Sequence, residues 1–160
     1  MATIVVGTNS YVTEAELTTY ANDRGVTLVA TPAVLLIKAM DYIEAQDYKG
    51  CKTEEDQALQ WPRNEVYTGK GCCYPCKMLD KTIVPSDIKN TQMILALQID
   101  LGNDPLATQG QAVKSETVDV VSVVYQDNTD SSPQLKAVRL LLSKYLANGA
   151  GTNSIRVSKA

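Results

Sequence analysis

Residues 85–101 read PSDIKNTQMILALQIDL, and this stretch predicts a helix at the centre of the fold. Pro85-Ser86-Asp87 is typical of a helix start, and Gly102 suits a left-handed C-terminal stop. Between these signals, apolar side chains cover most of the helix circumference, as they do in helices buried on several sides. We therefore expect this helix to be the core against which the other elements pack.

Two helices are expected before it. Thr13 and Glu16 have the spacing of a capping box, in which each side chain bonds the backbone N–H of the other residue, so the first helix should span 14–24. Pro32 follows a cap residue and stands at a first helical position, and the apolar residues after it share one face. The second helix should therefore run over 32–46.

A last helix is expected over 133–147. An Asp-Ser-Ser run before Pro133 repeats the start signal, and Leu135, Val138 and Leu142 keep a spacing close to that of a helix. The Asn-Gly pair that follows marks its end.

Two segments interrupt the helices. Residues 47–84 are rich in Gly, Lys, Cys and Pro, and apart from one predicted helical turn at 53–59 they form a long loop or small subdomain. Residues 111–126 are dominated by Val, a β-branched composition that favours a strand or hairpin arm. The predicted fold class is thus mainly α: a bundle of about four helices with a long Cys-containing loop and a small β strand or hairpin arm. We expect one domain over 1–147, followed by a flexible basic tail over 148–160.

The chain contains no histidine. This removes the commonest general base, every Ser-His-Asp or Cys-His arrangement, and all metal sites that use imidazole. Gly69-Lys70-Gly71 is too short for a phosphate loop and follows no predicted strand. The adjacent acids Glu54, Glu55 and Asp56 point in different directions and are typical of a solvated turn. We expect no catalytic residue and no enzyme.

The net charge is only −3, but the charges are unevenly distributed. Beyond Asp130 the chain has no acid, and its cations are Lys136, Arg139, Lys144, Arg156 and Lys159. This basic end is either a solvated helix face with a loose tail or a segment that docks on an acidic partner or nucleic acid.

No apolar run approaches the roughly 20 residues needed to cross a bilayer. The first residues, Met1 to Gly7, also lack the basic region and long apolar run of a signal peptide. We therefore expect no membrane partner and a protein that is made and kept in the cytoplasm.

The cysteines allow three interpretations. Cys51 stands alone, whereas Cys72, Cys73 and Cys76 are close together. All of them could surround a zinc ion, although adjacent cysteines make tetrahedral geometry awkward. They could instead form a disulfide, or remain reduced and partly buried thiols. We expect no cofactor, and zinc is the one alternative that the cysteines offer.

A further pattern runs through residues 11–63. Its parts are Tyr-Val-Thr at 11–13, Asp-Arg-Gly at 23–25, Ala-Met-Asp-Tyr-Ile-Glu at 39–44, Tyr-Lys-Gly at 48–50 and Gln-Ala-Leu-Gln-Trp-Pro-Arg at 57–63. Together with the helix that starts at Pro85, they resemble the head-to-tail connector (adaptor, or head-completion) proteins of tailed bacteriophages. Some members of that family carry a DnaT-like single-stranded-DNA-binding label. The Cys-rich stretch 71–77 departs from the family pattern.

The resemblance implies a structural virion protein that assembles into a ring, commonly a dodecamer, in the neck of the particle. Its partners would be other copies of itself, the portal protein above, a stopper or tail-completion protein below, and DNA in the channel. Assembly would take place in the cytoplasm of the host bacterium. The alternatives are a single-stranded-DNA-binding protein and a Cys-based zinc-binding interaction module.

We expect the subunit interfaces to use aromatic, basic and Val-arm residues, since Trp, Tyr and Arg are enriched at binding hot spots. The candidates are Trp61, Arg63, Val118, Val120, Tyr125, Lys136, Arg139, Lys144, Arg156 and Lys159. For Trp61 a second interpretation stays open, in which the ring anchors the bundle core and Arg63 covers it or pairs with an acid.

Overall fold

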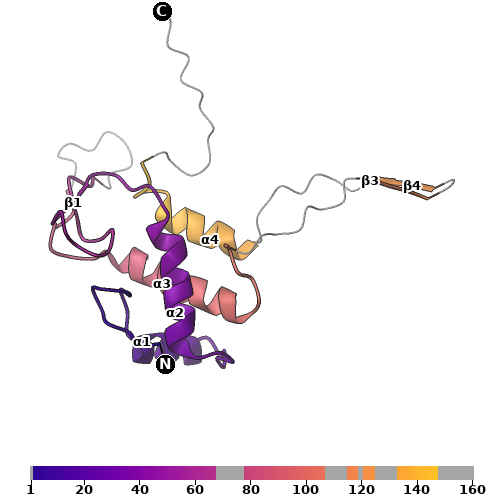
Figure 1. The fold of residues 1–160 in the computed structure, drawn as a ribbon, viewed down its shortest axis with the longest axis horizontal. Coiled ribbons are helices and arrows are strands. Elements are labelled where there is room, and N and C mark those ends of the chain that lie inside the picture. The colour runs from indigo at the N-terminus through magenta and orange to yellow at the C-terminus, as the bar shows by residue number, and fades with distance from the viewer. Residues whose placement is uncertain (1, 68–77, 107–114, 119–120, 125–132, 148–160) are drawn as a thin grey trace, which may run out of the picture.

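The computed structural model describes residues 2–67, 78–106, 115–118, 121–124 and 133–147. Its elements follow the order α1 (Glu14–Asn22), α2 (Pro32–Glu44), β1 (Cys51–Lys52), β2 (Arg63–Asn64), α3 (Ser86–Asp100), β3 (Ser115–Val118), β4 (Val121–Val124) and α4 (Pro133–Leu142). Figure 1 shows the helices gathered in one body, with β3 and β4 away from it. The prediction of a mainly α fold with about four helices and a β hairpin is confirmed.

α3 lies at the centre of the helical body, as its sequence predicts. It packs against α2 and α4, and α1 packs against α2 and α3. The fully buried residues of α3 include Ile88, Leu95 and Ala96. Gln92 is equally buried and its amide is fully used, because Oε1 accepts from the Tyr11 N–H at 3.0 Å and Nε2 donates to Ser10 Oγ and the Leu36 carbonyl. This polar contact joins the N-terminal segment to α2 and α3 without leaving a buried group unpaired.

α1 begins with the predicted capping box. The Thr13 hydroxyl accepts from the Glu16 N–H at 3.2 Å, and the Glu16 carboxylate accepts from the Thr13 N–H at 2.6 Å. The bond from the Thr13 backbone is the largest reason that the pKa of the Glu16 carboxyl is lowered. The helix ends at Asn22, slightly earlier than predicted, and the chain turns at Gly25 with a φ of 67°.

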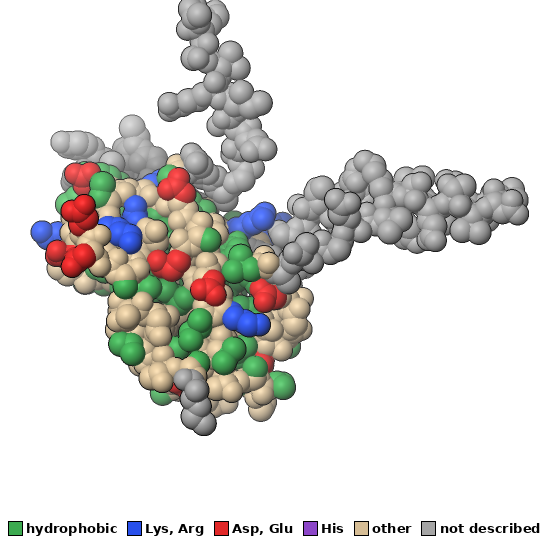
Figure 2. Space-filling view, in the orientation of Figure 1, with side chains coloured by type: hydrophobic (Ala, Val, Ile, Leu, Met, Phe, Trp, Pro, Cys, Tyr) green, Lys and Arg blue, Asp and Glu red, His purple; other side chains and the backbone are tan. Residues whose placement is uncertain are grey.

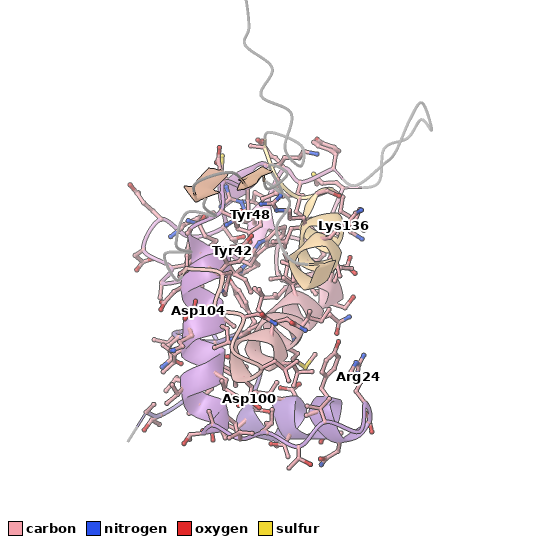
Figure 3. The ribbon with its side chains drawn as sticks, turned by 90° about the vertical axis from the view of Figure 1, so that its right-hand side faces the viewer. Arg24, Tyr42, Tyr48, Asp100, Asp104 and Lys136 are labelled. Atoms are coloured by element: carbon pink, nitrogen blue, oxygen red, sulfur yellow. The ribbon has the colours of Figure 1, made fainter. Side chains whose placement is uncertain are left out.

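α2 starts at Pro32, as predicted, but Thr31 makes no side-chain hydrogen bond at the cap. The carboxylate of Asp100, at the end of α3, accepts from the backbone N–H groups of residues 29–30, at 2.9 and 2.8 Å. Figure 3 shows Asp100 at the end of the body where α1 lies. This contact joins α3 to the chain just before α2, outside the first turn of the helix. The helix ends at Glu44, also slightly before the predicted end.

α4 ends at Leu142, well before the predicted position 147. Beyond it the backbone pairs with the loop that follows α2. The Tyr145 carbonyl accepts from the Lys49 N–H at 2.8 Å, and the Ala147 N–H donates to the Asp47 carbonyl at 3.0 Å. The spacing of apolar residues predicts one more helical turn here, but the chain forms these tertiary hydrogen bonds in its place.

The predicted helical turn at 53–59 is wrong, because this segment consists of turns and bends. The side chain of Gln57 bonds backbone groups before and after it in this segment. Its Oε1 accepts from the Glu54 N–H at 3.1 Å, and its Nε2 donates to the carbonyls of Leu59 and Pro62. One amide side chain therefore fixes the shape of the whole turn.

The segment 47–84 also contains the small antiparallel sheet of β1 and β2, which the sequence did not predict. Cys51 pairs with Asn64 in its register, and an isolated bridge joins Tyr67 to Met78. Gly50 has a φ of 74°, and a Cβ atom at this position would clash with the Asn64 carbonyl. The turn before β1 therefore requires glycine both for its conformation and for this close approach.

β3 and β4 form an antiparallel pair in which Ser115 lies opposite Val124 and Val118 opposite Val121. Among the described elements, these two strands contact each other and none of the helices. No helix in the described part of the chain is long and apolar enough to span a membrane.

Candidate assembly interface

Trp61 lies at the centre of an aromatic cluster inside the helical body. Its ring meets Tyr48 and Tyr145 edge to face, with centroid distances of 5.6 and 5.3 Å. The cluster locks together the loop after α2, the loop before β2 and the chain after α4. Only 2% of Trp61 is exposed, so the side chain occupies the core position of the second interpretation. Within the single subunit, almost none of the Trp61 surface is accessible to a partner.

Arg63 is also an interior residue, 7% exposed. Its guanidinium donates to three consecutive backbone carbonyls just before β1: from Nε to Lys49 at 2.9 Å, and from Nη2 to Tyr48 and Gly50 at 3.2 and 2.7 Å. Nη1 donates to the Gln60 side-chain oxygen at 2.6 Å. Arg63 thus satisfies loop carbonyls that a flexible or neutral side chain would leave unpaired.

A third contact joins Tyr11 and Glu44, two residues that the sequence did not mark as candidate site residues. The Tyr11 hydroxyl donates to Glu44 Oε1 at 2.6 Å and accepts from the backbone N–H of Trp61 at 3.1 Å. Glu44 Oε2 accepts from the Gln60 N–H at 2.8 Å. Burial, followed by the bond to Glu44, raises the pKa of Tyr11 far above its usual range. The signal was present in the sequence, since these residues all belong to the pattern that resembles connector proteins, and the structure brings them together around one ring.

The exposed face of α4 carries Lys136 and Arg139, as the basic end predicts. Leu140 lies beside them and is 67% exposed. Figure 3 shows Lys136 on the outer side of this helix. The face therefore presents two cations and one large aliphatic side chain to solvent.

Lys144 differs from these two cations, because it forms an ion pair with Asp87 at the start of α3. The same carboxylate accepts from the Tyr145 hydroxyl at 2.7 Å. The hydrogen bond from Lys144 is the largest reason that the pKa of Asp87 is lowered. Burial, followed by the bond to Asp87, raises the pKa of Tyr145. The structure thus gives Lys144 an internal partner.

The other predicted interface residues divide into two groups. Val118 is part of β3, in register with Val121 of β4. The remaining ones, which are Val120, Tyr125, Arg156 and Lys159, lie outside the described residues. Their interface assignments stay predictions.

The cysteines divide in the same way. Cys51 is exposed on β1. Cys72, Cys73 and Cys76 lie outside the described residues. Within the described ranges, no three His, Cys, Asp or Glu side chains are placed to hold a metal ion. The zinc, disulfide and free-thiol interpretations all remain open for the full set.

A groove between α1 and α3 was not anticipated from the sequence. It has a volume of about 430 Å³ and opens to solvent. Apolar groups such as Val12, Ala15 and Met93 line it, together with the charged Glu16 and Lys89. The polar side chains of Thr19, Asp23, Ser86 and Asn90 also line the groove, so its lining is mixed.

The chain was compared with known proteins and families. No curated protein and no solved structure matches it significantly. One family model does match, and it covers residues 2–160. The chain therefore belongs to the family described as "Putative DnaT-like ssDNA binding protein".

Proposed function

We propose that this protein is a head-to-tail adaptor of a tailed-phage particle, a structural virion protein that forms an oligomeric ring. The ring is a dodecamer that lies in the neck, between the portal and the stopper or tail-completion protein, around the DNA channel. It assembles in the cytoplasm of the host bacterium. The protein acts by burying surface between subunits and not by chemistry.

The observation that carries this proposal is the β3–β4 hairpin. In the described part of the chain it contacts no helix. A two-stranded hairpin is marginally stable alone in water, so a hairpin without a neighbouring layer calls for a partner. Each strand of such a pair also leaves one edge of main-chain donors and acceptors unpaired. Hairpins of successive subunits could pair through these edges and form a main-chain ladder around a ring.

The helical body supports the same function. The Trp61 cluster, the carbonyl bonds of Arg63 and the Tyr11–Glu44 contact hold its loops in fixed positions. A rigid body reduces the ordering cost of assembly, because less conformational freedom is lost when subunits associate. The residues that provide this rigidity are also the residues on which the resemblance to connector proteins rests.

Mass photometry of the purified chain, alone and mixed with its cognate portal, tests the proposal. We expect a discrete large assembly in at least one of the two samples. A chain that stays monomeric in both would contradict the proposal.

A second candidate function is single-stranded DNA binding, favoured by the description of the matching family. Lys136 and Arg139 on the exposed face of α4 are suitable phosphate contacts. The net charge of −3 and the isoelectric point of about 4.9 weigh against a large DNA footprint. Fluorescence anisotropy with a labelled single strand distinguishes the two functions. Tight binding with a steep salt dependence, by a chain that stays monomeric with portal, would favour DNA binding.

A further inference from the structure

The exposed face of α4 has features of a docking surface. We call Lys136, Arg139 and Leu140 the basic surface. The two cations are exposed, and Leu140, on the same face of the helix, is 67% exposed. Val138 and Leu142, on the opposite face, are buried. An aliphatic group next to long cationic side chains is a common composition at the edge of protein interfaces, where the charges orient the partner.

A second surface has the opposite charge. We call Glu54, Glu55, Asp56 and Ile83 the acidic surface. The three acids are exposed, Ile83 is 59% exposed, and the Thr53 hydroxyl donates to the Lys81 carbonyl, which brings the two segments side by side. Lys52 and Lys81 border this surface and reduce its charge, but the carboxylates outnumber them.

The acidic surface is held in shape before any partner arrives. Gln57 bonds the Glu54 N–H and the carbonyls of Leu59 and Pro62, and the Lys52 ammonium donates to the Gln57 carbonyl at 3.2 Å. A turn that is already ordered loses little conformational entropy on binding.

The two surfaces lie on different sides of the body. Figure 1 places β1, which the acidic turn follows, on one side and the start of α4 on the other. Figure 2 shows acidic side chains, with Lys or Arg side chains among them, on the β1 side, and Lys or Arg side chains near the start of α4. Two complementary patches on different sides of one chain have the arrangement of a head-to-tail contact, which generates rings when its rotation closes.

We infer that the acidic surface of one copy docks on the basic surface of the next copy. The inference rests on the proposed ring and names the helical-body contact within it. Charge complementarity identifies the occupant as a second copy of this chain, because both halves of the contact are present on it. The opposite charges orient neighbouring helical bodies, and Ile83 and Leu140 supply apolar contact area beside the charged side chains.

A charge-exchange experiment tests the inference. In one variant, Lys136→Glu and Arg139→Glu reverse the basic surface; in another, Glu54→Lys and Glu55→Lys reverse the acidic surface. Each variant alone places like charges at every contact, so its assembled fraction in mass photometry should fall on the order of tenfold. An equimolar mixture should restore assembly, because in a ring of alternating variants every contact again joins a negative surface to a positive one.

The matched control is Asp23→Lys combined with Asp41→Lys, which changes two exposed acids outside both surfaces. It should assemble like the wild type, and circular dichroism should show that all variants keep their helices. If both reversed variants assemble normally, or if the mixture fails to restore assembly, the inference is wrong while a wild-type ring still stands. If the wild type itself forms no assembly alone or on the portal, the proposed function fails first. A different result would assign the basic surface to DNA: the variant with Lys136→Glu and Arg139→Glu loses single-strand binding, the variant with Glu54→Lys and Glu55→Lys keeps it, and the mixture does not restore assembly.

Discussion

At the scale of single residues, Arg63 is the clearest case of a buried cation used for structure. It is 7% exposed and its partners are carbonyl oxygens of the loops around it. Lysine keeps the charge but loses the planar fork that reaches several carbonyls at once. We expect Arg63→Lys to lower the free energy of unfolding by about 2–3 kcal/mol in urea denaturation.

The matched control is Arg24→Lys. Arg24 is exposed and stacks over the Tyr20 ring, 3.3 Å from its centroid, at the surface of α1. Its replacement should cost well under about 1 kcal/mol. Equal effects of the two substitutions would mean that the carbonyl bonds of Arg63 contribute little.

Asp87 gives a prediction about pH. Its pKa is lowered in the folded protein, chiefly by the Lys144 hydrogen bond, so its ionised form stabilises the fold. For a lowered carboxyl pKa, this stabilisation is present above the unfolded value of about 3.9 and is lost as the pH falls through the folded value. We expect Asp87→Asn to cost about 1–2 kcal/mol at pH 7 in urea denaturation, and the cost should decrease progressively as the pH falls below the unfolded value and disappear only below the folded pKa.

A double-mutant cycle checks the cause of this effect. In a Lys144→Gln background, Asp87→Asn should cost clearly less at pH 7, because the cation that the carboxylate pairs with is absent. An unchanged cost would locate the effect elsewhere, for example in the Tyr145 hydroxyl bond.

At the scale of elements, starts of helices followed from sequence better than their ends. The capping box of Thr13 and Glu16 and the proline start of α2 involve neighbours in the chain, so a local pattern is sufficient to find them. The end of α4 depends on backbone bonds to the loop after α2, and the turn at 53–59 depends on the Gln57 side chain. Contacts that are not part of the helical periodicity determine both features, so the spacing of apolar residues alone cannot predict them.

The candidate site shows the same division. The exposed basic face of α4 follows from its composition and periodicity. The interior positions of Trp61 and Arg63 depend on partners such as Tyr145, which is distant in the chain. The Tyr11–Glu44 bond spans 33 positions and has no periodic signal. A family pattern marked these residues, but their geometry required the fold.

The two helix caps allow a direct comparison. Thr13 bonds the N–H of Glu16, whereas the Thr31 side chain makes no cap bond. We expect Thr13→Ala to destabilise the protein by about 1 kcal/mol and Thr31→Ala by a few tenths, roughly the cost of an unused cap residue. Thermal melts followed by circular dichroism measure both. A larger effect at Thr31 than at Thr13 would mean that the capping box contributes less to stability than its hydrogen bonds indicate.

Two glycines separate conformational strain from steric contact. Gly25 and Gly50 both have positive φ angles, but only at Gly50 would a Cβ clash with a backbone atom, the Asn64 carbonyl. Gly25→Ala should cost about 1 kcal/mol from backbone strain alone. Gly50→Ala should cost on the order of 3 kcal/mol, because β1 must also move away from β2. Equal losses of unfolding free energy would show that the β1–β2 turn yields easily.

At the scale of the whole molecule, the described chain has a well-packed helical body and a hairpin that contributes nothing to it. The core residues come from the helices, the N-terminal segment and the loops around Trp61. The described strands of the hairpin therefore lie apart from the core, so the hairpin can be changed without removing core contacts.

This separation leads to the last prediction. Replacing residues 115–124 by a Gly-Ser linker of equal length should leave the urea midpoint of the monomer unchanged, because the described strands contact no helix. The same variant should lose ring assembly alone and on the portal, since the main-chain edges of the hairpin are gone. A lowered midpoint would mean that the hairpin packs on its own body. An unchanged midpoint with normal rings in mass photometry would leave assembly to the helical surfaces, and the head-to-tail contact between the acidic turn and α4 would then be sufficient to close the ring.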